Sequence, residues 1–465
     1  MAVDFFTPVV PEDRQHPNFR MITTPGINEP AIEVIKSWAD GFVDRDGKMV
    51  KEFQTTFNST FWELYLHASF RELGFVADYG YETPDFILSK DGYKIVAEAT
   101  IASHPEGYTA EWERDISKEA VEKLDAEEIV ELASVRLANA LAAKHKKYLE
   151  SYSKLEHVQG LPFVLCIAPF EQPFFFEQSD NAIRRVLYSF DRYLHMDMPE
   201  EQKRIIFGEA MFDSIVKSSG TEIELGFFRD NRMKEVSAVI FSNCATFGKV
   251  RALSKSADFP IFFIAKRYND HGLQPLHIAQ EKKDYKETLL DGINLFLNPY
   301  AEKPLPLEAF RNREISIHRL DTETGDYLVE SPHGFLFQRM CVSAIPMGKT
   351  EELKRRVPNG KPMIPHAAPP WQEGELHKVN AVVGPFEDHY LAHFQGWTIL
   401  IVRDCDDDDW GAQAISAKVK TIPRFVQLNR SGKPVHLMAD GFYATKEKAL
   451  EAIQLKISQY MKRKG

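Results

Sequence analysis

Three acidic side chains interrupt apolar stretches between residues 57 and 101. Glu63 lies in the run NSTFWELYLHASFREL, Asp85 follows a proline at the start of DFILS, and Glu98 lies within YKIVAEATI. A buried carboxylate must be protonated, paired with a cation or bound to a metal ion, because burying it uncompensated costs many kcal/mol. Carboxylate oxygens are also the ligands that Mg²⁺ and Mn²⁺ prefer over softer groups. The three acids are therefore candidates for metal-dependent chemistry.

Each acid also has a structural interpretation. Glu63 could be paired with an Arg or Lys from another segment, as buried acids usually are. Asp85 after a proline could close a turn. Glu98 is harder to explain in this way, because it stands in the middle of an apolar strand.

The elements that must position these acids can be predicted from the residues around them. Residues 58–73 contain no Gly or Pro, offer Asn58 or Ser59 as an N-cap and end at Gly74, which predicts a helix. Asp91-Gly92 is typical of a two-residue hairpin turn between strands. The predicted order is one helix, three strands, a long helix and a buried strand, over residues 58–73, 75–81, 85–89, 93–101, 126–152 and 163–168.

Strand alternation and hairpin pairing bring the acids together. Period-two alternation puts Lys94, Glu98 and Thr100 on one face of their strand. The hairpin turn sets the strand of Asp85 beside the strand of Glu98. We expect the two carboxylates to converge, with Glu63 above them, in an all-oxygen pocket for Mg²⁺ or Mn²⁺.

This order of elements, with Glu63, Pro84-Asp85 and Glu98-Ala99-Thr100, resembles the PD-(D/E)XK nuclease superfamily over roughly residues 52–170. The resemblance implies a mixed α/β, restriction-endonuclease-like sheet flanked by helices. It also implies that Asp85 and Glu98 bind a divalent metal and that Glu63 is an auxiliary acid.

The chain departs from the superfamily pattern at one position, because Thr100 stands where a Lys that orients or activates the attacking water is usual. A cation would then have to come from Lys94 on the same face or from the next helix, or the metal would act alone. On that helix three cationic residues lie within about a quarter turn of one another and Asn139 is nearby, so they could contact a phosphate. These three are Arg136, Lys144 and Lys147.

Two functions remain open at this point. The first is a metal-dependent endonuclease that hydrolyses phosphodiester bonds, with DNA favoured over RNA and with a β-rich C-terminal half that recognises substrate or partner. Restriction and phage-defence nucleases often have this organisation, which is an analogy only. The second is a catalytically silent nuclease-fold protein that acts as a binding or assembly module, and Thr100 favours it.

The chain divides into three predicted parts. Residues 1–50 are predicted to form an N-terminal arm, residues 51–310 the α/β domain, and residues 311–465 a smaller β-rich domain with a terminal helix. The apolar runs at 236–241 and 260–265 are expected to extend the first sheet. The runs at 314–318, 326–330, 335–344 and 398–402 are expected to form the second sheet, and residues 357–370 a Pro-rich loop.

Composition limits the class of protein further. The chain has 465 residues with 57 Lys and Arg against 68 Asp and Glu, a formal charge of −11, so any nucleic acid must meet a local basic groove. The four cysteines show no metal-binding spacing. The acidic, Pro-containing N-terminus does not resemble a signal peptide, so we expect a cytoplasmic protein. A homodimer is a reasonable expectation, because cutting both strands of a duplex usually needs two sites.

Overall fold

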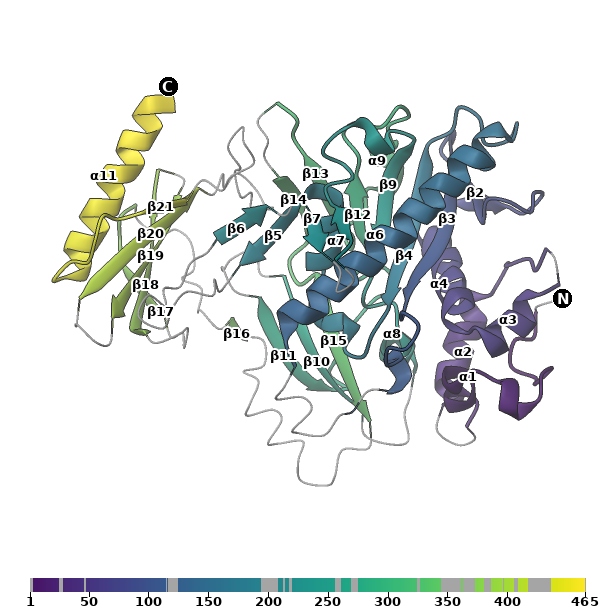
Figure 1. Cartoon of the computed structure of the whole chain (residues 1–465). Helices are drawn as coiled ribbons and strands as arrows, with labels where there is room; N and C mark the ends of the chain where they lie inside the picture. The colour runs from purple at the N-terminus through teal and green to yellow at the C-terminus, as the bar shows by residue number, and fades with distance from the viewer. Residues whose placement is uncertain are drawn as a thin grey trace.

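The computed structural model describes residues 3–24, 28–45, 47–113, 115, 124–193, 208–211, 214–216, 220–255, 261–268, 275–323, 327–343, 361–362, 373–379, 386–395, 397–404, 409–416 and 436–464. An eight-stranded mixed sheet forms the centre of the fold (Figure 1), with the strand order β1-β2-β3-β4-β9-β12-β13-β14. Its strands are β1 (Val76–Asp78), β2 (Phe86–Lys90), β3 (Tyr93–Ser103), β4 (Phe163–Phe170), β9 (Val236–Phe241), β12 (Asn294–Leu297), β13 (Ser316–Leu320) and β14 (Tyr327–Glu330). The prediction of a mixed α/β fold with a helix-flanked sheet is confirmed at this level.

Helices cover both faces of this sheet. One apolar cluster joins α1, α2, α3, α4 and α8 to one face, and a second joins α6 and α7 to the other. Figure 1 shows α6 lying across β3 and β4. The helices are α1 (Pro17–Ile22), α2 (Glu29–Trp38), α3 (Met49–Thr55), α4 (Asn58–Glu72), α6 (Ala126–Glu150), α7 (Asn181–Tyr188) and α8 (Phe247–Leu253), with the short α9 (Leu307–Phe310) beside the first cluster.

The segment from α4 to β4 has the element order that the sequence predicts. The strands β1, β2 and β3 form an antiparallel meander, and α6 then connects β3 to β4, which runs parallel to β3. Asp91 and Gly92 form the hairpin turn with φ angles of 50° and 83°, a backbone conformation that suits Gly and Asp. Every residue of β4 is buried, because helices cover both faces of this central strand.

The N-terminal arm packs against the main fold. Within residues 3–24 and 28–45, Phe5, Phe19, Ile35 and Trp38 are almost fully buried in the cluster that also contains α4. Trp38 packs edge-on against Tyr65 of α4, with ring centroids 5.4 Å apart. The short helices have too little periodicity to reveal this docking from the sequence.

The large sheet also continues beyond the boundary predicted near residue 310. The strands β13 and β14 are its last two members, so they do not belong to a separate C-terminal sheet. The apolar run at 260–265 corresponds to β10 (Ile261–Arg267), which leaves the large sheet and joins a four-stranded sheet. That sheet has the order β15-β10-β11-β16, with β15 (Leu336–Ser343), β11 (Leu276–Glu281) and β16 (Lys361–Pro362).

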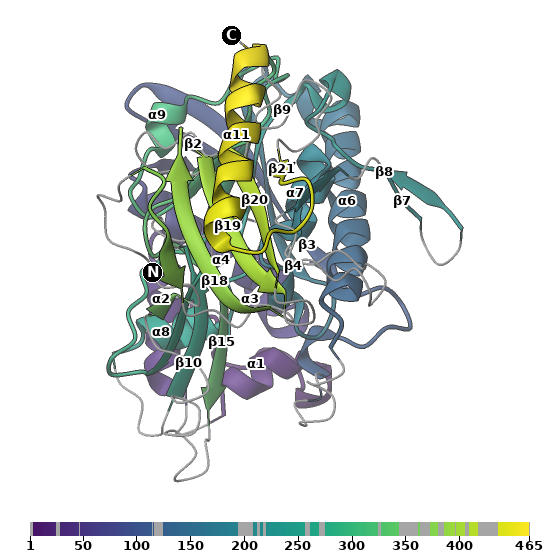
Figure 2. The ribbon, with the colours of Figure 1, turned by 90° about the vertical axis from the view of Figure 1, so that its left-hand side faces the viewer.

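The C-terminal part contains a five-stranded antiparallel sheet of order β17-β18-β19-β20-β21. The helix α11 (Lys446–Lys464) packs on one face of it through Ala449, Ile453 and Ile457, as Figure 2 shows. Its strands are β17 (His377–Val379), β18 (Phe386–Phe394), β19 (Trp397–Asp404), β20 (Trp410–Ser416) and β21 (His436–Met438). Most of the Pro-rich loop predicted at 357–370 lies outside the described residues.

The remaining strands form two small hairpins. The hairpins are β5 (Phe190–Tyr193) with β6 (Gly208–Met211), and β7 (Ser214–Val216) with β8 (Glu222–Glu224). No helix among the described residues has both the length and the apolar character needed to cross a bilayer.

Candidate acidic site

Glu98 is the buried centre of the candidate site. It lies in the middle of β3 and is 1% exposed. Its Oε1 accepts hydrogen bonds from Lys144 Nζ at 2.6 Å and from the Tyr152 hydroxyl at 2.9 Å, and Lys147 Nζ lies 3.4 Å away. Three donors, two of them ammonium groups, therefore hold one oxygen of this buried carboxylate in an apolar strand.

Asp85 lies directly opposite Glu98, because β2 and β3 pair with Phe86 beside Ala97. The Ala99 amide donates a 2.7 Å hydrogen bond to Asp85 Oδ2, and the Asp85 amide donates a long one, 3.4 Å, to Glu98 Oε2. These two contacts join the acids across the strand pair. Burial, and next the neighbouring charge of Glu98, raise the pKa of Asp85 to about 6.

Glu63 lies on the second turn of α4 and is the third acid. Burial raises the pKa of Glu63 to about 8, and the charges of Asp85, Glu52 and Glu98 add to this shift. Within the described residues its carboxylate has no hydrogen bond and no ion pair. The charges of Asp85 and Glu98 therefore act on Glu63 across the site.

The three acids do not form a ready-made metal cluster, which corrects the prediction of a shared pocket. No group of three or more His, Cys, Asp or Glu side chains in the described part of the chain is placed to hold one ion. Alternation along β3 explains why: Ala97 and Ala99 pack in the cluster that contains α4, whereas Glu98 points to the face covered by α6. Glu63 lies on α4, the helix that covers the other face, although the charges of Asp85 and Glu98 still act on it.

Two carboxylate oxygens nevertheless remain available side by side. Among the described residues, Asp85 Oδ1 accepts no hydrogen bond and Glu98 Oε2 accepts only the long one from the Asp85 amide. Mg²⁺ is commonly held by one or two carboxylates and keeps several of its water ligands. The donor chemistry of Asp85 and Glu98 therefore fits Mg²⁺ or Mn²⁺, with Glu63 as a neighbouring acid rather than a shared ligand.

Both lysines predicted on the long helix contact Glu98. Lys144 and Lys147 lie near the end of α6, and their side chains are 24% and 50% exposed. The Lys147 ammonium also lies 4.8 Å from the centroid of the Tyr152 ring. The helix therefore brings cations to the acids from the α6 face of the sheet.

Four other predicted residues are not brought into this cluster. Arg136 Nε donates to the Ser103 carbonyl at the far end of β3. Asn139 lies about 140° around the helix axis from Lys144. Lys94 is exposed and lies on the same face of β3 as Glu98, but it is about 13 Å away along the strand. Thr100 is partly buried, and the structure gives it no contact with the acids among the described residues.

Two residues of the site were missed from the sequence. Tyr152 begins the short 3₁₀ turn Tyr152–Lys154 after α6, and its buried hydroxyl contacts Glu98. Arg45 donates to the carbonyls of Tyr81 and Pro84, the latter at 3.3 Å, and so holds the loop before Asp85. Arg45 lies in a polar run that the sequence suggests only as a boundary. No local signal marks either residue, because both contacts are made across the fold.

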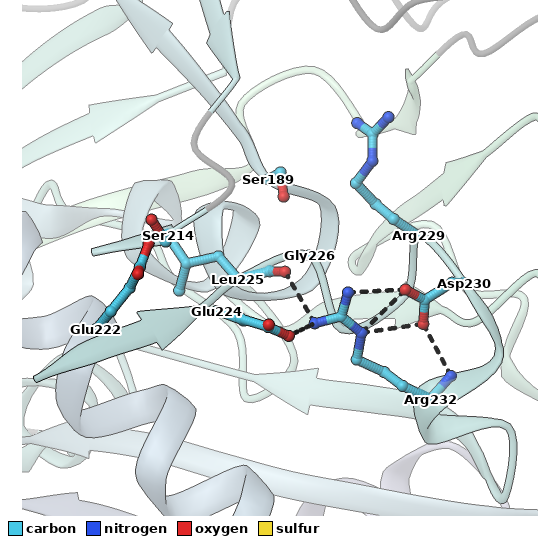
Figure 3. Close-up of a pocket in the computed structure, with 9 residues that line it drawn as sticks. All are labelled: Ser189, Ser214, Glu222, Glu224, Leu225, Gly226, Arg229, Asp230 and Arg232. Carbon is cyan, nitrogen blue, oxygen red and sulfur yellow. Dashed lines mark hydrogen bonds and ion pairs between the residues drawn. The ribbon is translucent and has the colours of Figure 1, made fainter. Parts of the chain in front are cut away.

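A separate surface pocket of about 480 Å³ lies between α7 and the β7-β8 hairpin, away from these acids (Figure 3). Its charged side chains pair with one another: Arg232 contacts Asp230 at 2.7 Å and Glu224 at 3.0 Å. Asp230 and Glu224 are therefore paired with a cation in a way that Glu63 and Asp85 are not.

Comparison with known proteins adds no assignment. No family model matches the chain, and no curated protein and no solved structure matches it either.

Proposed function

We propose that the chain is a metal-dependent nuclease of the PD-(D/E)XK type that hydrolyses phosphodiester bonds, with DNA as the favoured substrate. The observation that carries this proposal is the junction of Asp85 and Glu98, which leaves one carboxylate oxygen of each acid available beside the other. The element order from α4 to β4, a helix, an antiparallel meander and a parallel crossover, supports a restriction-endonuclease-like core.

Asp85 Oδ1 and Glu98 Oε2 would hold Mg²⁺ or Mn²⁺. When bound, such an ion lowers the pKa of a water ligand and stabilises charge on a phosphate oxygen. The raised pKa values of Asp85 and Glu63 support this assignment, because they indicate carboxylates that lack sufficient positive charge nearby.

Lys144 supplies the positive charge that a Lys in place of Thr100 would supply in the superfamily pattern. Its ammonium fixes Glu98 Oε1, which turns the other oxygen toward Asp85. Lys147 is half exposed, and its ammonium, which lies over the Tyr152 ring, can extend from there toward a phosphate. A cation supplied by α6 from this direction can stabilise negative charge that develops on the phosphate.

The test is cleavage of supercoiled plasmid and of labelled single-stranded DNA and RNA with Mg²⁺ or Mn²⁺. Asp85→Asn is the sharpest variant, because an Asn oxygen can still accept from the Ala99 amide while the charge is lost. Glu150→Gln is the matched control on α6, since that carboxylate is 64% exposed and lies outside the site. We expect Asp85→Asn to lose at least about 100-fold in rate and Glu150→Gln to cleave as the wild type does.

The second candidate is a catalytically silent binding module that retains the fold. Two observations favour this candidate: Thr100 stands in the Lys position, and no group of three ligating side chains among the described residues is placed to hold an ion. Cleavage that is absent from the wild type, or equal in the wild type and Asp85→Asn, would contradict the nuclease and favour the silent module.

A further inference from the structure

Tyr81 presents an exposed aromatic ring next to the acidic site. Its ring stacks on the His157 ring with centroids 3.9 Å apart and an angle of 18° between the planes. Tyr81 is 42% exposed, and no other aromatic ring in the described part of the chain contacts it. One face of the tyrosine is therefore occupied by histidine, and its remaining surface is open to a ligand.

The two rings are held in place by the loop that carries them. His157 Nε2 donates a 2.7 Å hydrogen bond to the Thr83 carbonyl, two residues after Tyr81. Arg45 donates from a single nitrogen to the carbonyls of both Tyr81 and Pro84. These bonds fix the backbone of the Tyr81 loop and tie the His157 ring to it, so the ring pair is pre-organised and a ligand would not need to order it.

Both rings belong to the segments that build the acidic site. Tyr81 stands four residues before Asp85, and the shared bond to Arg45 keeps its carbonyl close to that of Pro84. His157 follows Tyr152, which donates to Glu98. The ring pair is therefore carried by the loop that leads into Asp85 and by the segment that follows Tyr152.

We propose that Tyr81, supported by His157, stacks an unpaired base of a single-stranded nucleic acid whose backbone passes the acidic site. The inference rests on the proposed function for the position of the phosphate. Stacking on aromatic rings tolerates any sequence, because every base has a π-face. In a duplex the bases already stack on one another, so the ring pair favours single strands and unpaired ends.

Local charge agrees with this ligand. Lys147 in the last turn of α6 and Lys154 between α6 and His157 are both exposed. A single strand that stacks on Tyr81 would carry its phosphates past these ammonium groups, although the whole chain has a formal charge of −11.

The experiment is fluorescence anisotropy of the full chain with labelled oligothymidylate of about 12 nucleotides, in EDTA so that binding is separated from cleavage. A hairpin duplex of similar length is measured in parallel. Tyr81→Phe keeps the ring, and Tyr300→Ala removes an exposed tyrosine on another loop. Thermal melting of each variant checks that the fold is retained.

We expect Tyr81→Ala to weaken oligothymidylate binding about tenfold or more, with little effect on the duplex. Tyr81→Phe and Tyr300→Ala should bind as the wild type does. Unchanged binding by Tyr81→Ala, or an equal loss for single strand and duplex, would overturn the stacking proposal. If the wild type cleaves DNA but Tyr81→Ala gives either of these results, the stacking proposal fails and the nuclease proposal stands. If Tyr81→Ala weakens single-strand binding but the wild type cleaves no substrate, the nuclease proposal alone fails.

Discussion

Two clusters of buried charge in this molecule differ in how fully their carboxylates are compensated. Within the described residues of the acidic site, Lys144 and Lys147 pair with Glu98 and not with Asp85 or Glu63, and the pKa values of Asp85 and Glu63 are raised to about 6 and about 8, mainly by burial. Positive charge is therefore missing at this site.

The second cluster lies between α8 and β15 and centres on Glu287. Lys249 Nζ is 2.5 Å from Glu287 Oε1, Arg339 Nε is 3.0 Å from Oε2, and the Tyr285 hydroxyl donates to Oε2 at 2.7 Å. Burial alone would raise the pKa of Glu287, but Arg339 and Lys249 together lower it below its ordinary value. Every charge here has a partner within the chain.

The difference separates a structural cluster from a candidate functional one. A fully paired cluster such as that of Glu287 holds the four-stranded sheet against α8 and leaves nothing for a ligand. A cluster that is short of positive charge can gain it from a bound cation. The following predictions test this distinction.

The largest effect is expected in the closed cluster. Arg339→Met would leave Glu287 buried with one cation fewer, and breaking a buried pair from one side costs about 3–5 kcal/mol. Chemical denaturation measures the loss. Lys36→Met is the control, because its partner Glu33 is 70% exposed and a surface pair contributes at most about 1 kcal/mol. Equal losses of stability in the two variants would show that the buried Glu287 cluster contributes no more than a surface ion pair.

Loss of the cation on α6 should affect cleavage. Lys144→Met is expected to slow the reaction about 100-fold, which is about 2.7 kcal/mol in the barrier. Lys146→Met, whose side chain is 74% exposed on the same helix, should retain the wild-type rate. If Lys144→Met cleaves at the wild-type rate in a metal-dependent assay, Lys144 serves only to compensate Glu98 structurally.

A smaller effect with the opposite sign is expected for Glu63→Gln. The folded protein binds the Glu63 proton more tightly than the unfolded chain does, so its stability falls as the pH rises from 4.5 to about 8. Below pH 4.5 the group is protonated in both states and costs nothing. Glu63→Gln should therefore raise the free energy of unfolding at pH 8 by about 1–3 kcal/mol, with little change near pH 4.

Urea denaturation at several pH values measures this dependence in metal-free buffer. A variant that is no more stable than the wild type at pH 8 would show that Glu63 is already compensated, and the two clusters would then be alike.

The sequence revealed those parts of the fold that local signals determine. Asp91-Gly92 fixes the hairpin and hence the register that sets Asp85 opposite Glu98. The helix at Asn58–Glu72 ends beside Gly74, whose positive φ of 85° follows the usual C-terminal pattern. Both signals lie within a few residues of what they determine.

Other features depend on contacts between distant segments and could not be read in this way. A run such as 261–267 is typical of a buried strand, but its residues do not indicate which sheet the strand joins. The contacts of Lys144 and Tyr152 with Glu98 depend on the path of α6 across the sheet. The position of Glu63 on the opposite face depends on how α4 packs, which helical periodicity does not specify.

The most direct measurement is the melting temperature of the wild type and of Asp85→Asn as Mg²⁺ or Mn²⁺ is titrated. A ligand that binds only the folded state stabilises it by about 2.7 kcal/mol at 100 times its Kd. A melting temperature that rises with metal in the wild type and stays constant in Asp85→Asn is the predicted result. A wild type that melts at the same temperature with and without either ion would contradict the assignment of Asp85 and Glu98 as metal ligands.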